Sequence, residues 1–130
     1  MTKIKLDKLS GVLKMEMDKP DVEQDSRLAN RFIEPGAKIT SMRLKTTYTD
    51  KQMEQVVITE PSIKLVSETH KMSYRSKNGF TLRQLLKRIE LFERKSRVKT
   101  KWFDGIDAHH VFLEGVHKKK GNTYVLGWGS

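Results

Sequence analysis

The chain has 130 residues, no cysteine and a formal net charge of +10. This length suits one hydrophobic core and is too short for two. Without cysteine, a disulfide framework and thiolate metal ligation are both excluded. No run approaches the roughly 18 apolar residues that cross a bilayer, and the first residues lack the apolar region of a signal peptide. We therefore expect a single intracellular, cytoplasmic domain over residues 1–130 that does not enter a membrane.

Positive charge is concentrated in the second half of the chain. Residues 1–70 contain 12 Lys and Arg against 11 Asp and Glu, whereas residues 71–130 contain 14 against 5. Between residues 71 and 101, only Glu90 and Glu93 oppose 11 basic residues. A charge excess of this density attracts polyanions, although basic surfaces also serve solubility alone.

The first 78 residues are predicted to be mainly strand. Alternating apolar residues between 3 and 17 favour strand at both ends of that segment, with a break at Ser10-Gly11. Residues 18–36 are acidic and polar and contain two prolines, which indicates a connection with room for one short helix near Leu28.

Four further segments of this half are predicted as strands. Residues 42–48 alternate between apolar and polar side chains, which predicts a half-buried strand. The β-branched run at 56–59 is predicted to return as the second arm of a hairpin with it, and a helix across 50–57 is the alternative. Short strands are expected at 63–66 and 72–75, before a turn at Asn78-Gly79.

The best-specified element is a helix over residues 82–94. Thr81 and Gln84 have the spacing of a capping box, and Phe80 can contact Leu85 as a hydrophobic staple. The apolar side chains fall within an arc of about 120° on a helical wheel, so this face is expected to pack on the sheet. These side chains are Leu82, Leu85, Leu86, Ile89 and Phe92.

A β-hairpin is predicted over residues 110–128. Its arms are 110–116 and 123–128, and Gly121 and Asn122 between them tolerate the positive φ that a tight loop needs. These elements together predict an α+β fold, with a mainly antiparallel sheet, one amphipathic helix packed across it and a C-terminal hairpin.

The solvent-facing arc of the helix and the basic residues beyond it predict a surface for nucleic acid, an acidic protein surface or another polyanion. Glu90 and Glu93 can pair with cations one turn later and reduce part of the field. No helix-turn-helix pair and no RNA-binding aromatic signature supports sequence-specific recognition. The predicted surface consists of Arg83, Lys87, Arg88, Arg94, Lys95, Arg97, Lys99, Lys101, Lys118, Lys119 and Lys120.

Residues 104–117 hold the one cluster of side chains that could do chemistry. Adjacent histidines in a strand point to opposite faces, and a zinc site needs three or four converging ligands. A turn followed by ordinary strand histidines is therefore the preferred interpretation, without metal or cofactor. Because nucleophile elbows and phosphate loops are also missing, we expect a non-catalytic protein. The cluster comprises Asp104, Asp107, His109, His110, Glu114 and His117.

The alternative function is that of a structural or adaptor protein. Its sheet edges and an exposed Leu91, which lies on the polar arc of the helix, would contact a protein partner or a second copy of the chain.

Three strings in the last fifty residues resemble uncharacterised small proteins encoded by large DNA viruses of algae and amoebae. The strings are Phe80–Leu86, Asp107–Gly115 and Tyr124–Ser130, so the resemblance covers only residues 79–130. It implies a helix followed by two strands and no established activity. It also implies a virion or host-interaction role as one form of the adaptor function.

Overall fold

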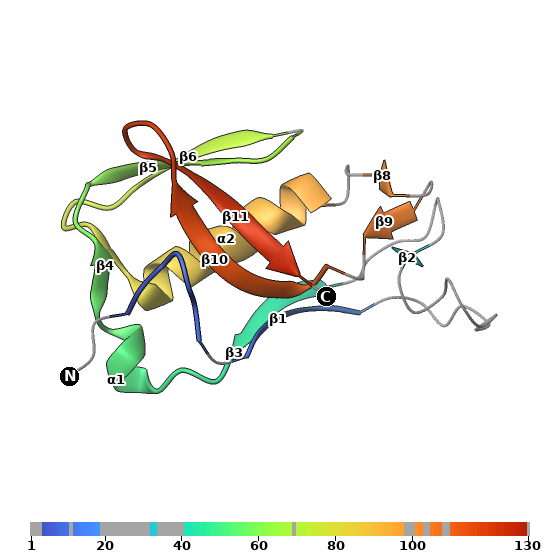
Figure 1. Cartoon of the computed structure of the whole chain (residues 1–130), viewed down its shortest axis with the longest axis horizontal. Coiled ribbons are helices and arrows are strands. Elements are labelled where there is room, and N and C mark those ends of the chain that lie inside the picture. Colours follow the sequence, from blue (N-terminus) through green and yellow to red (C-terminus); the bar gives the residue numbers. More distant parts are fainter. Residues whose placement is uncertain are drawn as a thin grey trace.

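The fold is α+β, with most of the described chain in strands and one long helix (Figure 1). The computed structural model describes residues 4–10, 12–18, 32–33, 41–68, 70–97, 101–102, 105–107 and 110–129. The elements are β1 (Leu13–Asp18), β2 (Phe32–Ile33), β3 (Ser41–Thr46), α1 (Asp50–Met53), β4 (Val56–Ile58), β5 (Ser62–Val66), β6 (Lys71–Arg75), β7 (Phe80–Thr81), α2 (Leu82–Ser96), β8 (Lys101–Trp102), β9 (Gly105–Asp107), β10 (Phe112–Lys118) and β11 (Thr123–Gly129).

The main sheet has six strands in the order β3-β1-β10-β11-β5-β6. Its neighbours are antiparallel except β11 and β5, which run parallel with Thr123 opposite Lys64. The α+β class is as predicted, but the sheet is mixed. A parallel pair needs a long crossover connection. The chain between β5 and β11 contains α2 and provides one, so the strand pattern alone could not fix this pairing.

The predicted helix and its capping box are confirmed. The Gln84 amide N–H donates to Thr81 Oγ1 at 3.1 Å, and the Thr81 N–H donates to Gln84 Oε1 at 2.9 Å. Phe80 and Leu85 are both fully buried in one core, as a hydrophobic staple requires. The helix continues to Ser96, two residues beyond the predicted end.

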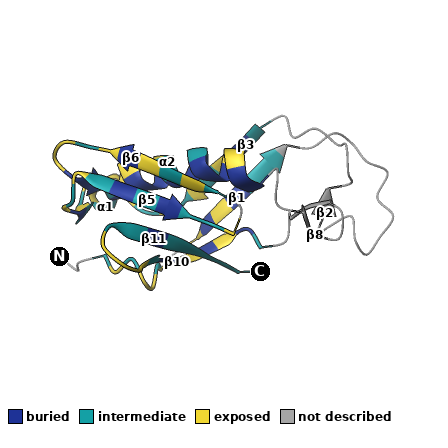
Figure 2. Cartoon of the chain, turned by 90° about the horizontal axis from the view of Figure 1, so that it is seen from above, coloured by how far each residue is buried: buried dark blue, intermediate teal, exposed yellow. Residues whose placement is uncertain are grey.

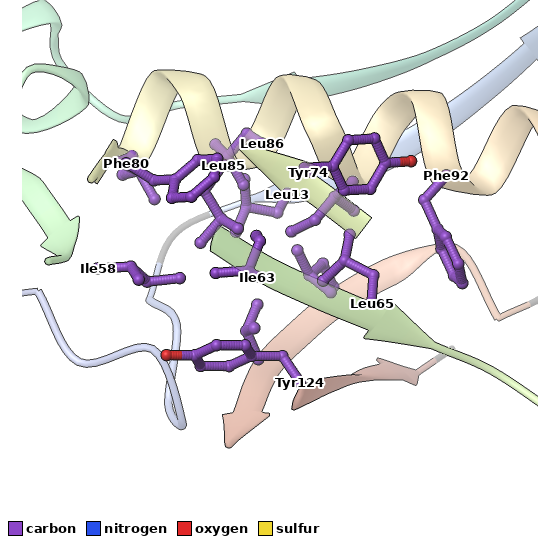
Figure 3. Close-up of a cluster of buried hydrophobic side chains, with 14 of the residues drawn as sticks. Leu13, Ile58, Ile63, Leu65, Tyr74, Phe80, Leu85, Leu86, Phe92 and Tyr124 are labelled. Atoms are coloured by element: carbon purple, nitrogen blue, oxygen red, sulfur yellow. The ribbon is translucent and has the colours of Figure 1, made fainter. Parts of the chain in front are cut away.

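The core lies between the apolar arc of α2 and one face of the sheet (Figures 2 and 3). Ile63 and Leu65 of β5 and Tyr124 of β11 belong to the same buried cluster as the apolar residues of the helix. Complete burial of one such side chain contributes about 1.5–3 kcal/mol, so this contact fixes how the helix lies on the sheet. The helix contributes Leu82, Leu85, Leu86, Ile89 and Phe92, all buried as predicted.

Side chains of α2 also close the outer edge of β3. Glu90 Oε1 accepts a hydrogen bond from the Leu44 N–H at 2.9 Å, and Arg94 Nε donates to the Met42 carbonyl at 2.8 Å. These two backbone groups point away from β1, toward the side on which β3 has no neighbouring strand in the sheet. The helix therefore takes the place of a neighbouring strand along this edge.

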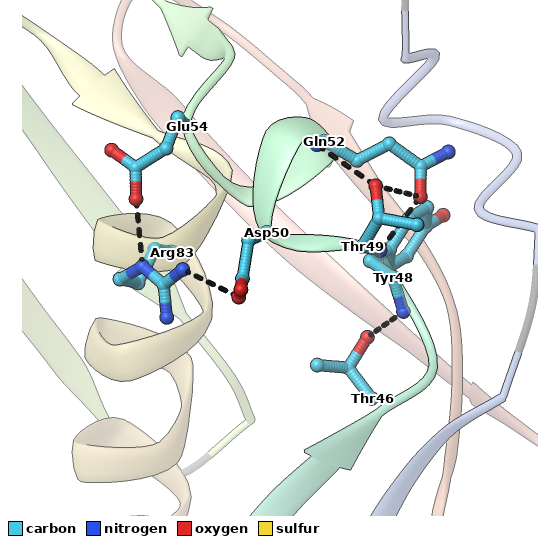
Figure 4. Close-up of polar contacts among 7 residues, drawn as sticks. All are labelled: Thr46, Tyr48, Thr49, Asp50, Gln52, Glu54 and Arg83. Carbon is cyan, nitrogen blue, oxygen red and sulfur yellow. Dashed lines mark hydrogen bonds and ion pairs between the residues drawn. The ribbon is translucent and has the colours of Figure 1, made fainter.

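The predicted hairpin between residues 42–48 and 56–59 is wrong. β4 pairs with β7 instead, with Val56 opposite Thr81 and Ile58 opposite Phe80. The short helix α1 intervenes, as in the alternative across 50–57, but it covers only Asp50–Met53. Its cause is a second capping box, in which Thr49 and Gln52 exchange hydrogen bonds of 2.9 and 3.2 Å (Figure 4). The Thr-x-x-Gln spacing was visible in the sequence.

The two ends of the described chain agree in part with prediction. β1 confirms the strand before residue 18, but residues 4–10 form an irregular segment whose Leu6 carbonyl accepts from the Val116 N–H at 2.6 Å. The C-terminal hairpin is confirmed as β10 and β11, and Gly121 in its loop has φ +64°. The predicted helix near Leu28 lies outside the described residues, as does most of the 18–36 connection.

The core assignment predicts a strong contrast between two leucines of α2. Leu85→Ala should lower the free energy of unfolding by about 2–5 kcal/mol, because Leu85 is fully buried. Leu91→Ala makes the same change on the half-buried side of the same helix and should lower it by less than about 1 kcal/mol. Urea denaturation followed by circular dichroism measures both. Equal losses would contradict the orientation of the helix.

Candidate polyanion-binding surface

Arg83, at the start of the predicted surface, is held by two carboxylates. Its Nε lies 3.0 Å from Glu54 Oε1 and its Nη2 lies 3.3 Å from Asp50 Oδ1 (Figure 4). These hydrogen bonds, that to Glu54 first, raise the pKa of the Arg83 guanidinium. α1 therefore supplies negative charge to the N-terminal end of α2.

Glu90 forms ion pairs with the next two cations of the helix. Its Oε2 lies 3.0 Å from Lys87 Nζ and 3.5 Å from Arg94 Nη2, while Oε1 accepts from the Leu44 N–H. Burial alone would raise the pKa of Glu90, but the hydrogen bonds from Lys87 and Leu44, together with the charges of Lys87 and Arg94, hold it below its ordinary value of 4.5. The three cations nearest β3 and α1 are thus all paired.

Arg97 belongs to the interior and not to the surface, so this part of the prediction is wrong. Its side chain is 5% exposed, with Nη2 2.7 Å from Glu93 Oε1. Nη1 donates to the His110 carbonyl at 2.8 Å, and the guanidinium lies over the Trp128 ring at 4.7 Å. Helical geometry explains the burial, because Arg97 follows Glu93 by one turn on the side of the apolar arc.

A pocket of about 490 Å³ opens beside this ion pair, between the C-terminal end of α2, the β5–β6 turn and β11. Phe92, Val66, Leu126 and Trp128 contribute apolar walls. Ser96 Oγ donates to Glu93 Oε2 at 3.1 Å, so the Glu93 carboxylate bonds to both Ser96 and Arg97 at the wall of the pocket. These interactions explain how charged side chains are accommodated at depth.

The hairpin lysines divide into one paired and two open side chains. Lys118 Nζ lies 2.9 Å from Glu60 Oε1, which also accepts from the Tyr124 hydroxyl at 3.2 Å. The hydrogen bond from Lys118 lowers the pKa of Glu60. Lys119 and Lys120 are exposed in the loop, and no carboxylate of the described chain pairs with them.

The remaining predicted residues are Arg88, Lys95, Lys99 and Lys101. Arg88 lies over the Tyr74 ring of β6 at 5.6 Å, and Lys95 is exposed two helical turns further along the same flank. Lys99 lies outside the described residues, and only the backbone of Lys101 is described, in β8. The structure thus leaves one flank of α2, the flank beside β6, without carboxylate partners among the described residues.

Sequence reasoning missed the cations of the two strands nearest that flank. Lys71 and Arg75 of β6 and Lys64 of β5 extend from the face opposite Tyr74 and Ile63. Neither strand contains an acidic residue, and the carboxylates nearest in sequence are Glu60, which pairs with Lys118, and the exposed Glu68 of the turn. The alternation of Lys71, Ser73 and Arg75 with Met72 and Tyr74 was the available signal.

We call seven of the open cations around this edge the β6 basic surface. The β10–β11 loop joins it, because Asn122 Nδ2 donates to the Ser62 carbonyl at 2.9 Å and the Lys64 N–H donates to the Asn122 carbonyl at 2.9 Å. Figure 2 shows exposed residues on β6 alongside α2. The surface consists of Lys64, Lys71, Arg75, Arg88, Lys95, Lys119 and Lys120.

The opposite end of the sheet is less basic. Glu16 of β1 lies 3.1 Å from Lys45 Nζ and 3.6 Å from Arg43 Nη2, and the hydrogen bond from Lys45 lowers the pKa of Glu16. Lys14 lies over the Phe112 ring at 5.8 Å. Among the described residues, charge is therefore distributed asymmetrically across the sheet.

The cluster at residues 104–117 is only partly described. Asp104 and His109 lie outside the described residues, and of Asp107 only the backbone is described, in β9. His117 covers two glycines: a Cβ at Gly115 would lie 2.9 Å from His117 Nε2, and one at Gly127 would lie 3.2 Å away. The side chains that the structure describes include no group of three or more His, Asp or Glu able to hold a metal ion.

Comparison with protein-family models, curated proteins and solved structures gives no match. The resemblance of residues 79–130 to viral proteins therefore stays a prediction. Within the described residues, no helix has the length and apolar character needed to span a bilayer.

Acid titration should reveal the role of Glu90. Its pKa is lowered on folding, so its contribution is present above pH 4.5 and disappears as the pH falls through the folded-state value. Glu90→Gln should therefore lower the free energy of unfolding at pH 7 by about 1–2 kcal/mol and flatten its fall below about pH 5. Glu54→Gln is the matched control at an exposed ion pair. If the two variants have superimposable pH profiles, Glu90 has no special role.

Because Arg97 and Glu93 form a buried ion pair, removing one partner should destabilise the protein more than replacing both. Arg97→Met leaves Glu93 buried without its cation and should lower the free energy of unfolding by about 3–5 kcal/mol. Adding Glu93→Met should recover most of that loss, because two apolar side chains of similar length need no charge partner. Denaturant titration of both proteins tests this. An additive loss in the double variant would argue against the pairing.

Proposed function

We propose that this domain is a non-catalytic binding protein that holds a polyanion at the β6 basic surface. The observation that supports the proposal is the division of the described cations into two groups. Those of α2 nearest β3 and α1 meet Asp50, Glu54 and Glu90, whereas those beside β6 have no carboxylate partner among the described residues. Unpaired cations are free to exchange their counterions for the charges of a ligand.

The binding mode is electrostatic. Cations within a Debye length of one another, about 8 Å at physiological salt, act on a charged ligand together. The seven cations lie on both faces of one sheet edge, on β5, β6, the adjoining flank of α2 and the β10–β11 loop, so their summed field surrounds this edge. Nucleic acid and acidic polypeptide both meet this requirement. The proposal therefore concerns charge density and includes no base-specific contact.

The surface proposed differs from the one predicted from sequence. Arg88, Lys95, Lys119 and Lys120 are retained, and Lys64, Lys71 and Arg75 are added. The paired residues Arg83, Lys87, Arg94 and Lys118 would contribute only after a ligand displaced their carboxylates. The pairs of Arg83 and Lys118 are exposed and therefore weak, whereas Lys87 and Arg94 are held by the buried Glu90. Arg97 is removed, because it is buried.

The adaptor function is the second candidate, and one observation favours it. β6 ends the six-stranded sheet and no further strand is paired to it in the described chain. Leu91 weakens this candidate as first formulated, because it is half-buried and so offers less apolar area than expected. Any protein partner would therefore bind through the sheet edge more than through the helix.

Salt titration of binding tests the proposal. Fluorescence anisotropy with labelled single-stranded DNA, duplex DNA and poly-glutamate should detect binding of at least one probe that weakens steeply between about 50 and 200 mM salt. Lys71→Glu/Arg75→Glu/Lys95→Glu should reduce the affinity about tenfold or more, because it inverts the local field.

Lys5→Glu/Lys8→Glu/Lys51→Glu is the matched control, since it makes the same change in net charge at exposed lysines outside the surface. It should leave affinity within about threefold of the parent. Equal losses in the two triple variants would mean that net charge alone governs binding. Absence of binding by every probe at 50 mM salt would reject the function.

A further inference from the structure

β6 presents a row of backbone groups that no described residue satisfies. The Ser76 N–H donates to the Pro61 carbonyl at 2.8 Å, which sets the alternation of the β5–β6 ladder. Tyr74 and Met72 then point their backbone groups toward β5, and Lys71, Ser73 and Arg75 point theirs outward. The Lys64 N–H agrees with this assignment, because it lies opposite Ser73 and bonds away from β6, to Asn122.

At the opposite edge of the sheet, the outward backbone groups of β3 are satisfied by side chains. There, Glu90 and Arg94 bond the outward N–H of Leu44 and the outward carbonyl of Met42. The described chain provides no corresponding side chain for β6, although α2 lies alongside it (Figure 2). Open N–H and C=O groups on an ordered strand are a template for pairing with another extended chain.

The chemistry around this edge selects for negative charge. Lys71 and Arg75 are exposed on the solvent face and stand four residues apart on β6, about 13 Å at the rise of a strand. On the other face, Arg88 lies over the ring of Tyr74, and Met72 is half-buried beside it with its sulfur 3.5 Å from the Tyr74 hydroxyl. One face of the edge is thus cationic, and the other is apolar with a cation above it.

We infer that the polyanion is an acidic polypeptide segment that pairs with β6 as a seventh strand of the sheet. This inference rests on the proposed function and names its partner. Two carboxylates spaced i and i+4 lie opposite Lys71 and Arg75, a small residue lies opposite Ser73, and the two residues between them are apolar and face Met72 and Tyr74. Cross-strand neighbours stand about 4.5–5.5 Å apart at Cβ, which suits these ion pairs.

Nucleic acid fits the edge less well. A phosphate accepts hydrogen bonds but does not donate them, so it cannot satisfy the outward carbonyls of Lys71, Ser73 and Arg75. A polypeptide backbone alternates donors and acceptors at the spacing of the strand and satisfies both. The N–H and C=O groups at this edge therefore favour polypeptide.

Binding of a labelled peptide with the central sequence Glu-Val-Ser-Val-Glu, capped at both ends, to the unmodified protein tests the inference. The peptide should bind, and N-methylation of its Glu and Ser nitrogens should weaken binding about tenfold or more, because those N–H groups face β6. N-methylation of the two Val nitrogens should change affinity less than about threefold, because those groups face solvent. Both modified peptides carry the same charge as the parent.

Two substitutions at Ser73 provide an independent test of strand pairing. Ser73→Pro removes one outward N–H at an edge position where proline is tolerated, and Ser73→Ala keeps it. The first should weaken peptide binding and the second should not, while both bind single-stranded DNA as the parent does. Because the methylated peptides test the parent protein, a folding defect in Ser73→Pro leaves the inference testable.

The outcomes separate the two proposals. Equal affinity for both methylated peptides, or binding of nucleic acid without binding of the peptide, would overturn strand pairing and leave the polyanion function standing. Failure of peptide, DNA and poly-glutamate alike would overturn both, and the cations of β6 would then serve only to keep the edge from aggregating.

Discussion

The rest of the structure depends on the docking of α2 against the sheet through its apolar arc. Burial of Leu85, Ile89 and Phe92 fixes the rotation of the helix about its axis, and this rotation decides which charged flank meets which strand. One flank turns toward β3, where Glu90 and Arg94 bond its open backbone groups. The other flank turns toward β6 and leaves Arg88 and Lys95 beside an edge without cover in the described chain. An apolar contact thereby determines the electrostatics of the surface.

Local sequence signals predicted the elements that local interactions create. The capping box of Thr81 and Gln84, the apolar arc of the helix and the glycine of the C-terminal loop each act within a few residues, so α2 and the β10–β11 hairpin could be placed from sequence. The same reasoning could have found α1 from Thr49 and Gln52. What it could not find is pairing between distant segments. The pairing of β4 with β7 and the pairing of β5 with β11 depend on where the helix places the chain in space.

The candidate surface was predictable as a charge excess but not as an arrangement. Counting residues shows the basic second half of the chain, yet the count treats Arg83 and Lys95 alike. Whether a cation is open depends on carboxylates from other elements: Asp50 and Glu54 reach Arg83 from the region of α1, and Glu60 reaches Lys118 from the segment before β5. Arg97 shows the limit most clearly, because its place within a basic run concealed its position on the buried side of the helix.

The central claim is that the helix closes one edge of the sheet and leaves the other open. Amide hydrogen exchange measured residue by residue tests it most directly. The Leu44 N–H should be protected although it lies on an edge strand, the Ser73 N–H should exchange at a rate typical of loops, and Tyr74, which pairs with β5, should be protected in the same strand. Protection of Ser73 equal to that of Leu44, or rapid exchange of Leu44, would contradict the account.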